Sequence, residues 1–336
     1  MKRSLSLWIA VLILLTITAM WVAMGLGSSQ GRLTFDGNWF ARLFEGDELE
    51  RNVLLIWRGP RVVAAAIVGL ALAVAGLLLQ GTTRNPLADP YLLGISGGAG
   101  LFVVLVRGLN FFQTADWWLT PIVAFCGAMI ANFLVLTLAR GTGGRITVLG
   151  LILGGVIINA FCAALMTFLL ARFDPFRLRV TTLWLAGGIG FARWSQLAMV
   201  GGVVLVAWVF LRSQAHKLNA FALGTEDAAS VGVDTDKLLL HSAVWASLLS
   251  AIGVSLAGLL GYVGLIVPHG VRMIVGHDFR VTLPLSGLAG ALLLVLADIA
   301  ARTLFAPEEL PTGVITALLG CPVLLILLRA QLRGKK

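Results

Sequence analysis

Residues Val62 to Leu79 form an unbroken run of apolar side chains and glycine, which constrains the fold more than any other feature of this chain. A helix needs about 20 predominantly apolar residues to cross the roughly 30 Å hydrocarbon core of a bilayer. Arg58 and Arg61 precede the run, and a polar turn beginning at Asn85 follows it. We therefore expect a membrane-spanning helix whose ends face two different aqueous compartments.

Similar apolar runs recur along the chain, and together they predict an all-α polytopic membrane protein of about ten transmembrane helices. Of all residues, 59% are hydrophobic and only 12% are charged, so no long polar segment remains for a soluble domain. We therefore expect residues 1–336 to form a single transmembrane domain. The predicted spans are residues 5–26, 62–79, 92–106, 118–139, 148–170, 194–211, 238–260, 262–275, 282–301 and 312–328.

The first of these runs follows Lys2 and Arg3, as the apolar region of a signal peptide would. It is longer than the roughly 7 to 15 residues of such a region, and no convincing cleavage site follows it. We interpret it as the first, uncleaved span.

The predicted span at 262–275 is short and contains Pro268, His269 and Arg272. Proline disrupts helical hydrogen bonding, so this segment places polar backbone and charge at membrane depth. Such backbone is tolerated only where protein or a watery cavity covers it. We expect a short broken helix inside the bundle.

The net charge of +9 is spread unevenly over the predicted connections. An even number of spans places both termini on one side. If that side is cytoplasmic, the inner connections carry most of the excess of Lys and Arg, which is the usual bias of cytoplasmic loops. We therefore predict that both termini are cytoplasmic. The positive charge reflects topology and contact with lipid headgroups, and it does not indicate a nucleic-acid partner.

The longest polar connection, residues 213–237, contains the signals of a short surface helix. Thr225 can cap its amino terminus, two acidic residues then complement the helix dipole, and two alanines favour helix. Gly232 can end it. From these residues alone, a capped loop helix without a partner is the favoured interpretation.

Several short motifs follow one another with a characteristic spacing: Arg58-x-x-Arg61, Asn85–Pro90 (NPLADP), Leu93–Ala99 (LGISGGA), Leu223–Gly232 (LGTEDAASVG), Gly264–Arg272 (GLIVPHGVR), Ala297–Arg302 (ADIAAR) and Glu309–Val314 (ELPTGV). Together they resemble the permease subunit of the ABC importers for ferric siderophores, haem and cobalamin, the type II ABC importers. The resemblance runs from about Arg58 to the carboxyl terminus. It implies a multi-pass permease domain in the cytoplasmic (inner) membrane that pairs with a second permease copy or a paralogue.

The resemblance also implies a separate ABC ATPase subunit, onto which the connection at 213–237 docks its short helix for coupling. The coupling residues carried over are Leu223, Gly224, Thr225, Glu226, Asp227, Ala228 and Ala229. This chain has no G-x-x-x-x-G-K-[ST] phosphate loop. ATP and Mg²⁺ are therefore expected on the ATPase, and we expect neither a cofactor nor a catalytic residue in this chain.

A soluble substrate-binding protein is the third implied partner. Arg58, Arg61 and Arg302 match the arginines that receive its acidic residues. Arg58 and Arg61 lie one turn apart at the start of a helix begun by Pro60, so they are expected to project outward together. The alternatives are that both extend to lipid headgroups and that Arg302 pairs with Asp298 one turn earlier.

The turn after the second span matches the cytoplasmic gate of the family, with Asn85 and Leu87 as the side chains carried over. A purely structural turn is the alternative, because proline stiffens the backbone there. Gly97 and its neighbours at the start of the next span either permit tight helix contact or line a wide pore.

A ferric siderophore is the expected substrate. The predicted outer loop at 172–179 carries more arginines than acids, which suits an anionic chelate, although it is equally explained as an interfacial loop. The histidines lie away from the predicted outer mouth, where haem would seek ligands. Haem and cobalamin remain alternatives within the family. Cys126, Cys162 and Cys321 lie in apolar runs without metal-ligand spacing, so we expect no metal site.

Two other classes are weighed against the ABC importer. An ion-coupled secondary transporter places ionisable groups along its pathway, and the spans here offer little beyond Asp298 and His269. An intramembrane enzyme would need a catalytic signature, and the spans contain none.

Overall fold

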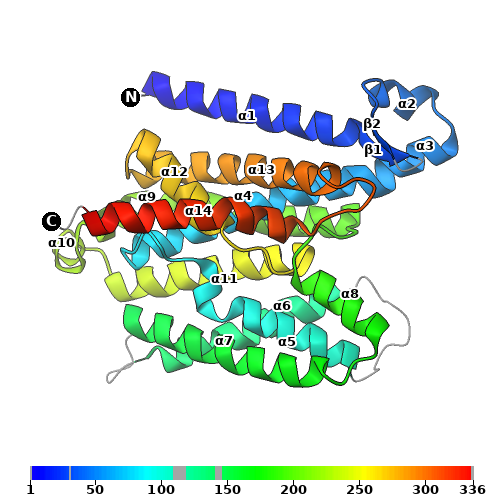
Figure 1. Ribbon diagram of the computed structural model, residues 1–336. Helices are drawn as coiled ribbons and strands as arrows, with labels where there is room; N and C mark the ends of the chain where they lie inside the picture. Colours follow the sequence, from blue (N-terminus) through cyan, green and yellow to red (C-terminus); the bar gives the residue numbers. More distant parts are fainter. Residues whose placement is uncertain (1, 30–31, 109–118, 141–145, 334–336) are drawn as a thin grey trace.

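Long helices dominate the computed structural model, which describes residues 2–29, 32–108, 119–140 and 146–333. The longest of them run roughly along one common direction (Figure 1). In chain order the elements are α1 (Lys2–Gly25), β1 (Leu26–Ser29), β2 (Arg32–Phe35), α2 (Trp39–Glu45), α3 (Glu48–Asn52), η1 (Val53–Arg58), α4 (Gly59–Thr82), η2 (Pro90–Leu93), α5 (Ile95–Gly108), α6 (Leu119–Leu138), α7 (Val148–Leu170), α8 (Pro175–Leu185), α9 (Trp194–Leu223), α10 (Thr225–Ser230), α11 (Thr235–Ala257), α12 (Val263–Val275), α13 (Phe279–Thr303) and α14 (Thr312–Arg333).

Among the described residues, seven helical segments are long and apolar enough to cross a membrane. Three further apolar segments are shorter, namely α5, α12 and the part of α14 from Thr312 to Ile326. The predicted helical class is confirmed apart from one antiparallel hairpin of β1 and β2. The predicted number of about ten spans is confirmed only in part. Residue 118, with which one predicted span begins, lies outside the described residues, as do residues 1 and 334–336 at the termini.

Helix α4 is the centre of the bundle, and it packs against α13, α11, α12 and α9. Its small residues explain this position. A side chain at Gly69 would collide with the backbone of Gly290 in α13, and one at Gly76 with the backbone of Gly264 in α12. Such close backbone approach is how helices gain packing energy in lipid, where hydrophobic exclusion between helices is absent. Gly97 and its neighbours in α5 are likewise buried against other helices, as tight packing predicts.

Three prolines lie inside helices in the part of the chain that the structure describes, Pro268, Pro284 and Pro322. At Pro268 and Pro284 a neighbouring helix compensates for the missing N–H. Pro268 in α12 cannot bond the carbonyl of Gly264, which instead accepts from Gln80 Nε2 at 3.1 Å. Pro284 in α13 likewise leaves the carbonyl of Arg280 to the guanidinium of Arg212, whose Nη1 donates at 2.9 Å. Neighbouring side chains are expected to pair backbone groups that a proline frees within a membrane.

The prediction of a helix broken within 262–275 is therefore wrong in its position. Helix α12 is short but continuous through Pro268. The non-helical backbone lies just before it, between Ala257 and Val263, where Gly258 and Tyr262 adopt positive φ angles of 65° and 69°.

Two predicted connections are also largely helical. The loop expected at 213–237 is mostly the last turns of α9, which extends to Leu223, and the first turn of α11. Good helix formers such as Gln214 and Ala215 continue α9 beyond its apolar part. The outer loop expected at 172–179 contains the start of α8, whose amino terminus is capped by Asp174.

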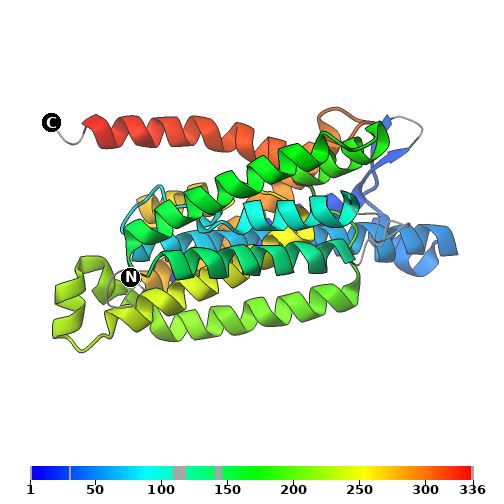
Figure 2. The ribbon, with the colours of Figure 1, turned by 90° about the horizontal axis from the view of Figure 1, so that it is seen from below.

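The two ends of the bundle differ in character (Figure 1). The β1–β2 hairpin, α2, α3 and η1 gather at one end, which we call the hairpin end. The start of α1, the end of α14 and the short helix α10 all lie toward the other end, the α10 end. Figure 2 shows that α14 and α9 lie on opposite sides of the molecule.

Candidate functional site

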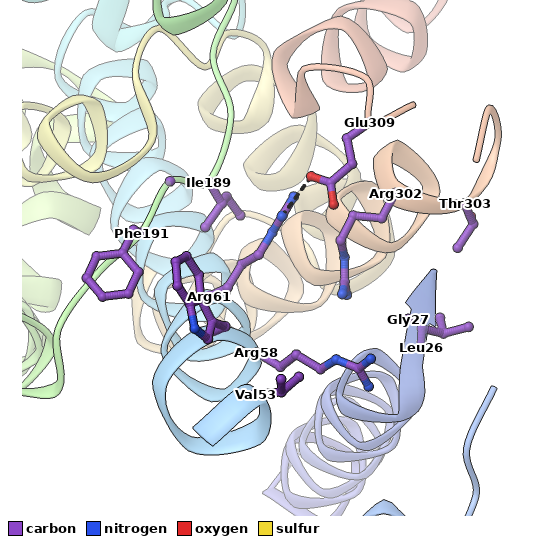
Figure 3. A pocket seen from close by; sticks show the side chains of 12 residues that line it. Leu26, Gly27, Val53, Arg58, Arg61, Ile189, Phe191, Arg302, Thr303 and Glu309 are labelled. Carbon is purple, nitrogen blue, oxygen red and sulfur yellow. Dashed lines mark hydrogen bonds and ion pairs between the residues drawn. The ribbon is translucent and has the colours of Figure 1, made fainter. Parts of the chain in front are cut away.

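Three arginines surround one pocket of about 440 Å³ at the hairpin end (Figure 3). Arg58 is the last residue of η1, Arg61 lies in the first turn of α4, and Arg302 lies in the last turn of α13. Pro60 stands at the beginning of α4, as the sequence predicts. The packing of α4 against α13 brings together residues that are far apart in the sequence. We call this site the arginine pocket.

Asp298 is the acceptor that two of these arginines share. Arg61 Nη2 lies 3.0 Å from its Oδ1, and Arg302 Nε lies 3.1 Å from its Oδ2. The Asp298 side chain is only 2% exposed. The Thr312 hydroxyl also donates to Oδ1, at 3.4 Å. A buried carboxylate is stable only when it is paired in this way.

Glu309 forms the other ion pair of Arg61, with 2.8 Å between Nη1 and Oε2 (Figure 3). Its side chain is 52% exposed, so water screens this pair far more than the Asp298 pairs. Three arginines thus meet two carboxylates, and the pocket keeps an excess of positive charge.

Arg58 and Arg302 also hold the end of α1. Arg58 Nη1 donates to the carbonyl of Met24 at 2.9 Å, and Arg302 Nη2 donates to that of Ala23 at 3.3 Å. The last carbonyls of a helix have no partner within the helix, and they form the negative end of its dipole. The two arginines therefore cap α1 and fix it against the rest of the bundle.

These contacts correct the expectation that Arg58 and Arg61 project outward together. Both line the same pocket, but they bind different parts of the chain. Arg58 donates to a carbonyl at the end of α1, and Arg61 pairs with Asp298 and Glu309. The alternative pairing of Arg302 with Asp298 is present. Sequence spacing gave no sign that Asp298 also binds Arg61, because 237 positions separate them. It also missed the aromatic wall that Trp57 and Phe191 add to the pocket.

The short helix predicted after residue 224 is present as α10. Its cap differs from the prediction, because Gly224 occupies the N-cap position and Thr225 is the first helical residue. Gly232 has a φ of 81° just beyond the end of the helix. Its N–H donates to the carbonyl of Ala229 at 3.0 Å, so the predicted stop is confirmed.

The predicted coupling residues form a projecting surface at the α10 end. Ala228 is buried against the bundle, whereas Glu226 and Asp227 are exposed. Leu223 before the helix is 80% exposed, and Val231 after it is 69% exposed. Sequence reasoning did not single out Val231, although an apolar residue in a polar connection is a signal for a contact surface. The surface therefore combines an acidic centre with apolar flanks.

The predicted gate residues lie in a tight turn between α4 and η2. Asn85 Oδ1 accepts from the N–H of Leu87 at 3.0 Å, which closes the turn. The preceding residue, Arg84, places its guanidinium 5.2 Å from the centre of the Phe221 ring. Phe221 is buried in the last turn of α9, directly before α10. The residue just before the predicted gate is therefore in contact with the end of α9, which leads into the predicted coupling helix.

Two of the three arginines in the segment 172–179, which was expected to attract an anionic chelate, have nearby partners. Arg177 pairs with Asp174 at 3.0 Å, and Arg172 stacks on Phe168 at 5.3 Å from the ring centre. The arrangement agrees better with an interfacial segment than with an anion funnel.

Comparison with known proteins agrees with this architecture over nearly the whole chain. The model of the FecCD transport family matches residues 9–330. A hemin transport system permease protein of Yersinia pestis is 40% identical over 281 residues, which cover 82% of this chain and 84% of the relative. A cobalamin import system permease protein of Halobacterium salinarum is 40% identical over 272 residues, which cover 81% and 72% respectively.

Among solved structures, a metal-chelate type ABC transporter in an inward-facing conformation matches with a TM-score of 0.80 at 28% sequence identity. The match covers 97% of this chain and 99% of that one. The chain therefore belongs to the FecCD transport family, whose members are the membrane-spanning permease subunits of ABC transporters and leave ATP hydrolysis to a separate subunit.

Proposed function

We propose that this chain is the permease subunit of an ATP-driven importer that moves a ferric siderophore across the inner membrane. The observation that carries this proposal is the separation of two different contact surfaces. The arginine pocket lies at the hairpin end of the bundle, and the acidic and apolar surface of α10 lies at the other end (Figure 1). A permease that receives cargo on one side and an ATPase on the other needs this arrangement.

At the hairpin end, the partner is a soluble substrate-binding protein with acidic residues. The excess of positive charge in the arginine pocket supports this choice, because complementary charge speeds the encounter of transient partners. The ion pairs to Asp298 and Glu309 hold Arg61 in place before the partner arrives, so little side-chain entropy is lost on docking.

At the α10 end, the partner is the ABC ATPase, which carries ATP and Mg²⁺. Nucleotide-driven movement of α10 would pass to the turn at Asn85 and Leu87 through the contact between Arg84 and Phe221. The α10 end is then cytoplasmic, and with it both termini (Figure 1). A second permease copy or a paralogue completes the pathway. The native mass of the assembled complex tests that composition, since it should contain two permease chains.

The identity of the substrate needs its own test. The two relatives described above are named for hemin and for cobalamin, so these chelates are supported as well as a siderophore. The deciding experiment measures uptake of labelled ferric siderophores, haem and cobalamin by cells that express this chain with its ATPase and binding protein. ATP-dependent accumulation of one compound, absent with an inactive ATPase, identifies the substrate. Haem or cobalamin uptake without siderophore uptake would overturn the siderophore proposal.

Docking is tested separately with Arg58→Glu combined with Arg61→Glu. We expect the binding protein to lose its affinity for the complex while the ATPase stays associated. A matched control reverses two exposed arginines outside the pocket, Arg51→Glu with Arg179→Glu, and should retain docking. Unchanged docking in the first variant would refute the assignment of the arginine pocket.

A further inference from the structure

A second cavity, of about 530 Å³, lies between α1, α4, α9 and α13. Its walls are almost entirely apolar, with Ile9 from α1, Ile67 from α4 and Gly201 from α9 among them. The residues at its rim face outward, since Leu205 is 60% exposed and Ile13 is 41% exposed. It is therefore a groove on the membrane-facing side of the bundle. The arginine pocket is elsewhere, at the hairpin end.

A positively charged side chain, that of Arg212, lies at one end of the groove. Arg212, in the part of α9 that approaches the α10 end, lines it together with Trp208. The bond from Arg212 Nη1 to the carbonyl that Pro284 leaves unpaired fixes the guanidinium at this position. A guanidinium has five N–H donors, so others remain for a ligand.

The charge of Arg212 is not neutralised by the protein. Among the described residues, no carboxylate lies within ion-pair distance of it. Asp278, at the start of α13, is engaged elsewhere, because it accepts from Asn219 Nδ2 at 2.7 Å and from the N–H of Arg280 at 2.9 Å. Burial opposes ionisation of Asp278, but these hydrogen bonds outweigh it and lower its pKa. Asp278 therefore stays ionised and bound to its own partners.

We propose that this groove binds one anionic phospholipid from the leaflet at the α10 end. One acyl chain occupies the apolar groove, and the phosphate accepts hydrogen bonds from Arg212. An apolar slot of this volume is large enough for a specific ligand, and basic pockets between transmembrane helices recognise anionic headgroups. Trp208 supports this depth, because tryptophan is enriched where the bilayer meets water. The site is independent of the transported substrate.

The headgroup is tested with purified, delipidated protein in detergent. Phosphatidylglycerol and phosphatidylcholine with identical acyl chains are compared by native mass spectrometry and by the shift in melting temperature. We expect tighter binding and a larger shift with phosphatidylglycerol. Arg212→Gln should weaken phosphatidylglycerol binding roughly tenfold or more, since bonds to a charged group are lost. Arg179→Gln, the same charge change at an exposed site on α8, should not.

The acyl-chain site is tested by filling the groove. A Cβ at Gly201 would lie 3.5 Å from Ile67 Cδ1, so Gly201→Phe places its ring in the groove. Gly202, with nothing within 4 Å of its Cβ position, does not line the groove, and Gly202→Phe is the matched control. Only the first variant should abolish binding.

Three results would overturn the proposal: equal binding of the two lipids by the unmodified protein, equal effects of Gly201→Phe and Gly202→Phe, or stabilisation by inorganic phosphate alone that matches the lipid. The first and third need no variant, so the proposal stays testable if a variant fails to fold.

Discussion

Replacing Asp298 by asparagine removes a buried carboxylate that pairs with two arginines at once. The Arg302 side chain is only 10% exposed and loses its carboxylate partner, while Arg61 keeps Glu309 at 2.8 Å. Breaking a buried ion pair from one side costs about 3–5 kcal/mol, because the remaining charge stays buried without compensation. Since Arg61 remains paired and is partly exposed, we expect the lower end of this range, about 3 kcal/mol.

The assay is unfolding of the purified protein in detergent, by heat or by a denaturing detergent. Asp298→Asn should lower the apparent melting temperature by roughly 4 °C. Glu309→Gln is the control, because an ion pair at a 52% exposed side chain contributes less than about 1 kcal/mol. If the two variants lose equal stability, the reasoning about Asp298 is refuted. If Asp298→Asn abolishes transport while docking and ATPase turnover stay intact, the ion-coupled alternative returns.

Two further perturbations test other parts of the structure. Reversing the charges of α10 with Glu226→Lys and Asp227→Lys should abolish ATP-driven uptake without unfolding the protein, since both side chains are exposed, and normal uptake would exclude α10 as the coupling helix. Ser247→Ala should destabilise the protein by about 1–3 kcal/mol, because it leaves the buried Asn132 Oδ1, which lies 2.8 Å from the serine hydroxyl, without this donor. The same hydroxyl lies 2.7 Å from the carbonyl of Ala243, a contact within its own helix. Ser250→Ala is its control in the unfolding assay, because that hydroxyl bonds only a carbonyl of its own helix, and equal effects would show that the bond to Asn132 contributes nothing.

The transmembrane helices were predictable because hydrophobic length alone determines which segments can span a bilayer. Hydropathy, however, indicates which residues lie within the lipid, and it does not indicate where a helix ends. Helix α9 therefore extends to Leu223 although its apolar run stops near residue 211. For the same reason, hydropathy did not predict α8 or the structured segment between α1 and α4, because both are polar enough to resemble loops.

The candidate sites were predictable only as far as local spacing reaches. Arg58 and Arg61 are a visible pair in the sequence, and Asp298 and Arg302 are another. That the two pairs form one cluster depends on the packing of α4 against α13, which follows from close glycine contacts and not from a local pattern. The irregular backbone before α12 was not predicted, because Pro268 is the stronger helix-breaking signal in the sequence. Pro268 does not break α12, since Gln80 donates to the Gly264 carbonyl that the proline leaves without a partner.

The carbonyls freed by Pro268 and Pro284 have a mechanical consequence. Gln80 ties α4 to α12, and Arg212 ties α9 to α13, each through a bond that the helix itself cannot replace. If α12 slid along α4, the buried carbonyl of Gly264 would lose its hydrogen-bond donor. This loss costs about 1–3 kcal/mol, in addition to any loss of packing. Since α4 packs against all three of the others, these four helices should move as one rigid body. Relative motion during a transport cycle then falls to the segments around them, α5 to α8 and α14.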